Sequence, residues 1–149
     1  MKPAPKPRYL LDINVLLDYM QQRQPWYPQA KALFLAERQE KVDLYIAANT
    51  VPTLFYLIRQ KGSTRKAIAK LEILLQRVRL ADVTTRVIEL AFRLGLEDLE
   101  DGIQVAAALE AGIPVLVTRD SKHFGRIPAP QILSPEIAVA ALDYSRSQG

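Results

Sequence analysis

The amino-acid sequence predicts an α/β fold of three layers, in which a central, mostly parallel sheet is flanked by helices. Short apolar runs typical of buried strands alternate along the chain with longer segments whose apolar residues recur at helical spacing. Helix-capping and helix-ending residues separate the two kinds of segment. No internal repeat or low-complexity block interrupts this alternation, so the 149 residues are expected to form one domain.

The first half of the chain begins with the strand that organises the rest. An apolar run starts at Arg8 and ends at Asp12, and an apolar helix follows at once. A continuous apolar run of this kind is typical of a strand covered on both faces of a parallel sheet. The elements predicted next are helices over 13–20, 26–39 and 50–60 and a strand over 42–47.

The second half repeats the pattern with clearer boundaries. Ser63 suits the cap of a helix over 64–77, and Gly95 and Gly112 suit the ends of two later helices. The remaining predicted elements are strands over 79–83, 113–118 and 131–133 and helices over 84–94, 100–111 and 134–142. The proline-rich segment over 1–7 is expected to be a flexible tail, which leaves 8–143 as the folded domain.

Composition excludes several kinds of chemistry. The chain has no cysteine and a single histidine, His123, so thiolate metal sites, cysteine nucleophiles and paired-histidine mechanisms are excluded within one chain. The absence of cysteine agrees with a reducing cytoplasm. A net charge of +4 makes a polyanionic partner plausible. No apolar run is long enough for a membrane span, and His123 is expected to be a surface or turn residue.

Two aspartates follow predicted parallel strands. Asp12 ends the first strand, and Asp120 lies just beyond the strand over 113–118. Because the loops that leave parallel strands at their carboxyl ends share one edge of the sheet, both side chains are expected at the edge where α/β folds bind ligands. Asp12 has a competing interpretation as a helix cap, a role for which aspartate is favoured.

A third group of acids precedes the helix that feeds the strand over 113–118. It consists of Glu97, Asp98, Glu100 and Asp101. Acids in a first helical turn complement the helix dipole, and Asp98 and Asp101 have the spacing of a capping box. This structural explanation is stronger for Asp98 and Glu100 than for Asp101, which remains a candidate for function.

Carboxylates gathered at one edge require a partner of opposite charge. Two of them roughly 4 Å apart repel by about 4 kcal/mol at an effective dielectric near 20, unless they share a proton or hold a cation. Oxygen ligands without cysteine or further histidine favour Mg²⁺ or Mn²⁺ over zinc. Such ions activate water and stabilise the leaving oxygen in phosphodiester hydrolysis, so the pattern indicates metal-assisted hydrolysis.

Three blocks carry a resemblance to a known family. The segments over 11–16, 99–109 and 117–124 resemble, in order and separation, three blocks of the PIN domain as found in VapC-like toxins. The resemblance implies a PIN-like three-layer fold and an Mg²⁺- or Mn²⁺-dependent endoribonuclease. It also implies an RNA substrate, a homodimer and a small antitoxin protein that neutralises the toxin.

The same resemblance assigns roles to individual residues. Asp12, Asp101 and Asp120 would be the catalytic acids that bind the metal or orient its water. Asn14 would be a supporting amide, and Thr118 would position Asp120 or the substrate by hydrogen bonding.

One position departs from the family pattern. PIN domains of the toxin type carry a glutamate in the helix after the second strand, and Thr53 stands at that position. Loss of this carboxylate is expected to weaken metal binding unless Asp98 or water replaces it.

A basic cluster lies where the helices over 50–60 and 64–77 meet. Arg59, Lys61, Arg65 and Lys66 either contact RNA phosphates or form a solvated face.

Two other functions compete with a nuclease. A PIN fold that has lost one acid could serve as an RNA- or protein-binding module without hydrolysis. A phosphatase of the haloacid-dehalogenase type also has an aspartate at the end of its first strand, but it needs a second aspartate two residues later, where this chain has Asn14.

Overall fold

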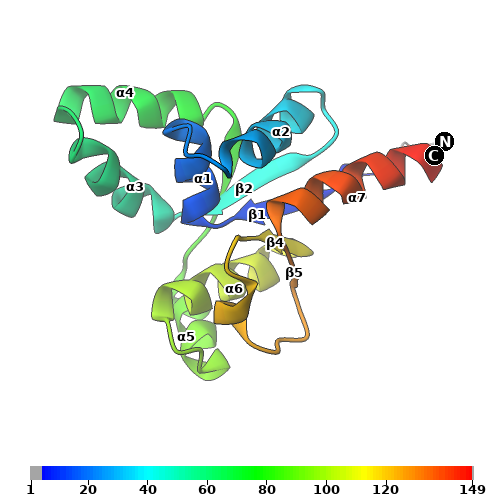
Figure 1. Cartoon of the computed structure of the whole chain (residues 1–149). Helices are drawn as coiled ribbons and strands as arrows, with labels where there is room; N and C mark the ends of the chain where they lie inside the picture. Colours follow the sequence, from blue (N-terminus) through cyan, green and yellow to red (C-terminus); the bar gives the residue numbers. More distant parts are fainter. Residues whose placement is uncertain (1–4, 149) are drawn as a thin grey trace.

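The computed structural model of the chain describes residues 5–148 and contains five strands, seven α-helices and one short 3₁₀ helix in this part (Figure 1). Residues 1–4 of the predicted tail lie outside the described residues. In chain order the elements are β1 (Arg8–Leu11), α1 (Ile13–Met20), α2 (Tyr27–Arg38), β2 (Asp43–Ala47), α3 (Thr50–Arg59), α4 (Thr64–Leu74), β3 (Val78–Ala81), α5 (Thr85–Leu94), α6 (Leu99–Ala111), β4 (Val115–Val117), η1 (Ser121–Phe124), β5 (Gln131–Leu133) and α7 (Pro135–Gln148).

The sheet has β1 at its centre. Its strand order is β3-β2-β1-β4-β5, and every neighbouring pair is parallel. The prediction of a mostly parallel sheet is therefore correct, and the sheet formed by the described strands is entirely parallel. The chain moves outward from β1 through β2 to one edge and later returns to β4 on the other side, which makes the end of β1 a switch point where such folds form sites.

Two separate cores cover the two faces of the sheet. Figure 1 shows α1, α2, α3, α4 and α7 on one face and α5 and α6 on the other, as the predicted three-layer architecture requires. Successive residues of β1 alternate between these cores, because Leu11 packs with the first group and Leu10 with the second. Both leucines are completely buried, and the acid that follows them is thereby held at a fixed position.

Local sequence signals explain most helix boundaries. The side chains of Ser63, Thr84 and Asp98 each accept a hydrogen bond from a backbone N–H in the first turn of α4, α5 and α6. Gly95 and Gly112 end α5 and α6 in the left-handed conformation that glycine adopts without a steric penalty.

The predicted helix over 64–77 is too long, and the predicted strand over 79–83 is displaced. Helix α4 ends at Leu74, because Gln76 and Arg77 make tighter turn bonds to the carbonyls of Ile73 and Leu74. Strand β3 then starts at Val78, which pairs with β2. Helix α4 buries Ala67, Leu71 and Leu74, whereas Ile68 is 45% exposed.

Two other boundaries differ from prediction. Strand β4 is shorter than the predicted 113–118, because the N–H of Ile113 bonds to the carbonyl of Ala108 at the end of α6 and Pro114 has no N–H to donate. The last helix extends beyond the predicted Leu142 to Gln148. Within residues 5–148, none of the helices has the length and apolarity needed to cross a membrane.

Candidate active site

Asp12 is a buried acid that accepts three hydrogen bonds. It lies directly after β1, is only 7% exposed, and caps α1 by accepting the N–H of Ile13 at 2.8 Å on Oδ1. The same Oδ1 accepts Nε2 of Gln104 at 3.1 Å, and Oδ2 accepts the hydroxyl of Thr118 at 2.8 Å. Asp12 thus caps a helix, as one of its two interpretations expects, and is also held by polar groups from α6 and the end of β4.

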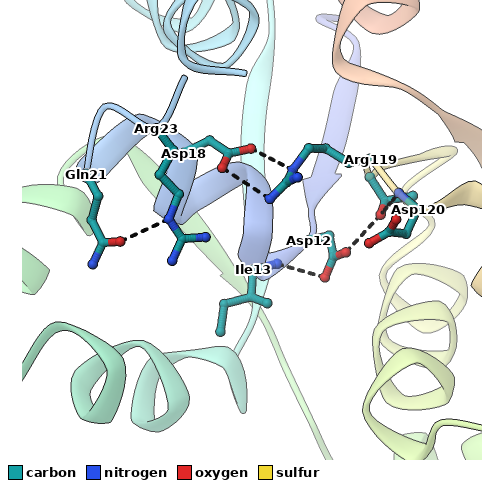
Figure 2. A network of polar contacts seen from close by, with 8 residues as sticks. Asp12, Ile13, Asp18, Gln21, Arg23, Arg119 and Asp120 are labelled. Atoms are coloured by element: carbon teal, nitrogen blue, oxygen red, sulfur yellow. Dashed lines mark hydrogen bonds and ion pairs between the residues drawn. The ribbon is translucent and has the colours of Figure 1, made fainter. Parts of the chain in front are cut away.

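Thr118 connects two of the predicted site residues. Its buried hydroxyl donates to Asp12 and accepts the backbone N–H of Asp120 at 3.1 Å. Figure 2 shows Asp12 facing the segment that carries Asp120. Because β1 and β4 are neighbours in register, the residues that follow them meet at the same edge of the sheet.

Asp101 lies in the first turn of α6 and is electrostatically coupled to Asp12. Burial is the main cause that raises the pKa of Asp101 from 3.8 to about 6. The charges of Asp98, Asp12 and Glu100 raise this pKa further, whereas His123 lowers it. The ionised form of Asp101 is therefore disfavoured, as expected for a partly buried carboxylate placed among other acids.

The predicted cap of α6 is present. Asp98 Oδ1 accepts the backbone N–H of Asp101 at 3.1 Å. A hollow of about 300 Å³ opens beside this turn and is lined by Glu97, Asp98, Asp101 and His123. His123 is exposed on η1, as a surface residue should be, and it adds a basic group to an otherwise acidic hollow.

The sequence profile of the PIN domain matches residues 8–122, which is most of the chain. The chain belongs to the PIN domain family. Among curated proteins, no significant match is found. The match extends from β1 to η1 and includes every acid described above.

Solved structures show the same fold at low sequence identity. VapBC2 from Rickettsia felis, bound to a DNA fragment from its promoter, is 21% identical, with a TM-score of 0.65 over 85% of this chain and 97% of the other. VapBC from Salmonella typhimurium, also DNA-bound, is 19% identical, with a TM-score of 0.68 over 87% and 98%. VapC20 from Mycobacterium tuberculosis, a toxin that cleaves the sarcin-ricin loop, is 17% identical, with a TM-score of 0.62 over 82% and 98%.

The oxygen atoms at this edge of the sheet are of the kind that a hard divalent cation prefers as ligands. Asp12 and Asp101 offer carboxylate oxygens from two elements, and their mutual repulsion would be relieved by positive charge. Oε1 of Gln104 is buried without a hydrogen-bond partner, as suits an acceptor for a metal-bound water. Among the described residues no three acids are gathered into a ready-made cation site, so water or a substrate phosphate would complete the ligand set.

Two functional candidates were absent from the sequence-based prediction. Gln104 lies one helical turn after Asp101, a spacing that places both on the same face of α6 and could have identified Gln104.

The second candidate is Asp18, which is 1% exposed and pairs with Arg119, with 2.8 Å between Oδ2 and Nε. Burial raises the pKa of Asp18, and the charges of Arg119 and Arg23 oppose this rise. No local sequence signal predicts the pair of Asp18 and Arg119, which are 101 positions apart.

Other predicted site residues lie outside this cluster of contacts. Asn14 is half-buried in the first turn of α1, and Thr53 is half-buried in α3. The basic residues Arg59, Lys61, Arg65 and Lys66 are exposed where α3 and α4 meet, at the end of α3 remote from β2 (Figure 1).

Proposed function

We propose that this PIN domain is a metal-dependent endoribonuclease and the toxin of a toxin–antitoxin pair. The observation that supports it best is a buried carboxylate, Asp12, at the switch point of the sheet, where Gln104 of α6 and Thr118 after β4 hold it by hydrogen bonds. Packing of the apolar cores gains nothing from two carboxylates that repel each other at this edge. Metal-assisted phosphodiester hydrolysis uses such carboxylates to hold its cation. The fold shared with VapC toxins supports the same assignment.

In this proposal the ion is Mg²⁺ or Mn²⁺, held by Asp12 and Asp101, with Asp120 completing the site and Asp98 as a further candidate. The ion would supply a water of lowered pKa and positive charge for the phosphate. The chain itself fixes Asp12 through Thr118 and Gln104 and places Asp120 through its backbone N–H. Oε1 of Gln104 is free to orient a water.

The direct test is RNA cleavage by the purified, antitoxin-free chain. We expect cleavage that requires Mg²⁺ or Mn²⁺, is abolished by a chelator and is lost in Asp101→Asn. Glu72→Gln, a change of an exposed acid on α4, is the matched control and should leave cleavage intact. Absence of metal-dependent cleavage at every enzyme concentration, or equal cleavage by Asp101→Asn, would contradict the proposal.

The partners follow from the same assignment. We propose a small antitoxin protein as a partner, because the similar structures of Rickettsia felis and Salmonella typhimurium are of VapBC. We also propose a homodimer, which the resemblance to VapC-like toxins implies. Sedimentation of the chain alone and with a co-expressed antitoxin tests both. A monomer that binds no product of a neighbouring gene would contradict this part of the proposal.

A binding module without hydrolysis is the second candidate. Thr53 in place of the family glutamate, together with the absence of a gathered set of three acids among the described residues, favours it. This alternative requires RNA binding that survives the double change Asp12→Asn and Asp120→Asn and does not depend on metal. Loss of binding in the double variant would exclude it.

A further inference from the structure

A guanidinium and an indole are stacked beside the candidate active site. Cζ of Arg119 lies 3.7 Å from the ring centroid of Trp26, at the start of α2. Asp18 fixes the orientation of the guanidinium, with Nε 2.8 Å from Oδ2 and Nη2 3.3 Å from Oδ1 (Figure 2). Arg119 is therefore held as a rigid planar group, and Trp26 remains 42% exposed.

These two side chains border a hollow of about 360 Å³. Pro25 and Gln29 line it from the α2 side, and Ser134 and Glu136 line it from the start of α7. The volume falls within the roughly 300–1,000 Å³ of small-molecule sites. It combines flat stacking surfaces with an amide, a hydroxyl and a carboxylate at the rim, so a planar heterocycle with polar edges fits its chemistry.

We propose that this hollow is a subsite for one unpaired base of a single-stranded RNA, which extends the stack that Trp26 and Arg119 form. The inference rests on the proposed ribonuclease function and specifies where a nucleotide beside the cleaved bond is held. Arg119 immediately precedes Asp120, so a base bound here is close to the acids at the edge of the sheet.

The charges of the hollow favour a base over a phosphate. Asp18 neutralises the cation of Arg119, and Glu136 adds negative charge to the rim, where a phosphate would be repelled. Stacking on aromatic and guanidinium planes requires no net charge and accepts any base. Gln29, Ser134 and Glu136 offer hydrogen-bonding groups to the edge of such a base.

Trp26 is the only tryptophan of the chain, so its fluorescence reports this hollow alone. The wild-type chain in a chelator, where cleavage is blocked, is titrated with a short single-stranded oligoribonucleotide and with an abasic oligomer of equal length and charge. We expect the RNA, and not the abasic oligomer, to change the emission of Trp26. Failure of the RNA to bind, binding of the RNA without a change in emission, or an equal change with the abasic oligomer would overturn the proposal.

Variants give a second readout by fluorescence anisotropy of labelled RNA. Trp26→Leu should weaken binding roughly five- to a hundredfold, the effect of losing one base stack, and Trp26→Phe should restore part of it. Phe92→Leu is the matched control, because Phe92 is 65% exposed on α5, across the sheet. Equal binding by folded Trp26→Leu and wild type would count against the subsite, as would an equal loss in the control.

The two proposals fail in different ways. If the chain cleaves RNA but Trp26 does not respond to it, the nuclease stands and the subsite is wrong. If Trp26 responds to RNA bases but no cleavage occurs with any divalent metal, the subsite stands and the nuclease is wrong.

Discussion

Asp101 is the residue whose environment most opposes its ordinary ionisation. Its pKa of about 6 in the folded chain lies above the 3.8 of an unperturbed aspartate, chiefly because of burial. A raised carboxyl pKa means that the folded state binds the proton more tightly than the unfolded state. The contribution of Asp101 to the free energy of unfolding is therefore highest below pH 3.8 and falls as the pH rises through about 6.

Asp101→Asn should accordingly stabilise the metal-free protein at neutral and alkaline pH. We expect a higher melting temperature than wild type at pH 7.5 and little difference at pH 4, measured by circular dichroism in a chelator. The amide keeps the backbone N–H that Asp98 accepts, so the cap of α6 is retained. A lower melting temperature at pH 7.5 would show that the carboxylate is stabilised by contacts rather than opposed by them.

Thr118 is the second residue with a measurable role. Thr118→Val keeps the shape of the side chain and removes the hydroxyl that joins Asp12 to the N–H of Asp120. We expect the free energy of unfolding to fall by about 1–3 kcal/mol, because the buried carboxylate of Asp12 and the part-buried N–H of Asp120 lose their partner. Urea denaturation measures this loss.

The metal proposal adds a second expectation for the same variant. Removal of a group that orients a ligand should weaken Mn²⁺ binding about 10- to 100-fold, as measured by calorimetry. Thr118→Ser, which keeps the hydroxyl, should resemble wild type in both measurements. Unchanged stability and metal affinity in Thr118→Val would remove Thr118 from the site.

At the scale of elements, α6 connects the site to the second core. Its buried residues pack on α5 and the sheet, while its first turn carries Asp98 and Asp101. Gly102 follows Asp101 and faces Ala91 of α5, where an added Cβ would lie 3.5 Å from the carbonyl oxygen and 3.7 Å from Cβ. These are ordinary van der Waals distances, so glycine is not required there by lack of space.

Gly102→Ala should therefore raise the free energy of unfolding by about 0.5–1 kcal/mol, since alanine loses less backbone freedom in a helix. Gly112→Ala is the informative counterpart at the end of α6. Its φ of +67° is left-handed, and alanine there should cost about 1–2 kcal/mol. Urea denaturation of both variants measures these changes in the free energy of unfolding. A destabilised Gly102→Ala would mean that the contact between α5 and α6 does not accommodate the added methyl group.

Across the whole molecule, the net charge of +4 attracts RNA to one place only if the positive side chains gather on one surface. The exposed cations where α3 and α4 meet are one candidate for such an RNA-binding surface. They lie at the end of α3 that is remote from β2. A solvated face explains the same residues without any role in binding. The salt dependence of RNA affinity separates these explanations, because each phosphate contact contributes about −0.7 to its slope for single strands.

If this corner contacts RNA, changing Arg65 and Lys66 to glutamine should make the slope of log affinity against log salt shallower by about one unit or more. The control variant changes Arg79 and Arg93, two exposed cations on β3 and α5, to glutamine and should keep the wild-type slope. A slope equal to wild type in the first variant would assign the corner to solvent.

Much of this organisation is written in short stretches of sequence. The capped starts at Ser63 and Asp98 and the glycine ends at Gly95 and Gly112 predicted helix limits correctly, because caps depend on a few neighbouring residues. Errors appear where distant partners decide: the predicted helix over 64–77 ends early, at Leu74, and Val78 begins a strand that pairs with β2. Parallel strands also have ends that share one edge of a sheet, so the sequence predicts Asp12 and Asp120 at the same edge.

Periodicity and caps are local properties, so the α/β class, the first strand and the acids that follow parallel strands can be predicted from the sequence. The surroundings of those acids depend on contacts that form only when the chain folds. Gln104 reaches Asp12 across 92 positions, and Arg119 reaches Asp18 across 101, and no local pattern records such pairs. The raised pKa of Asp101 is likewise a property of burial and of neighbours brought together by folding.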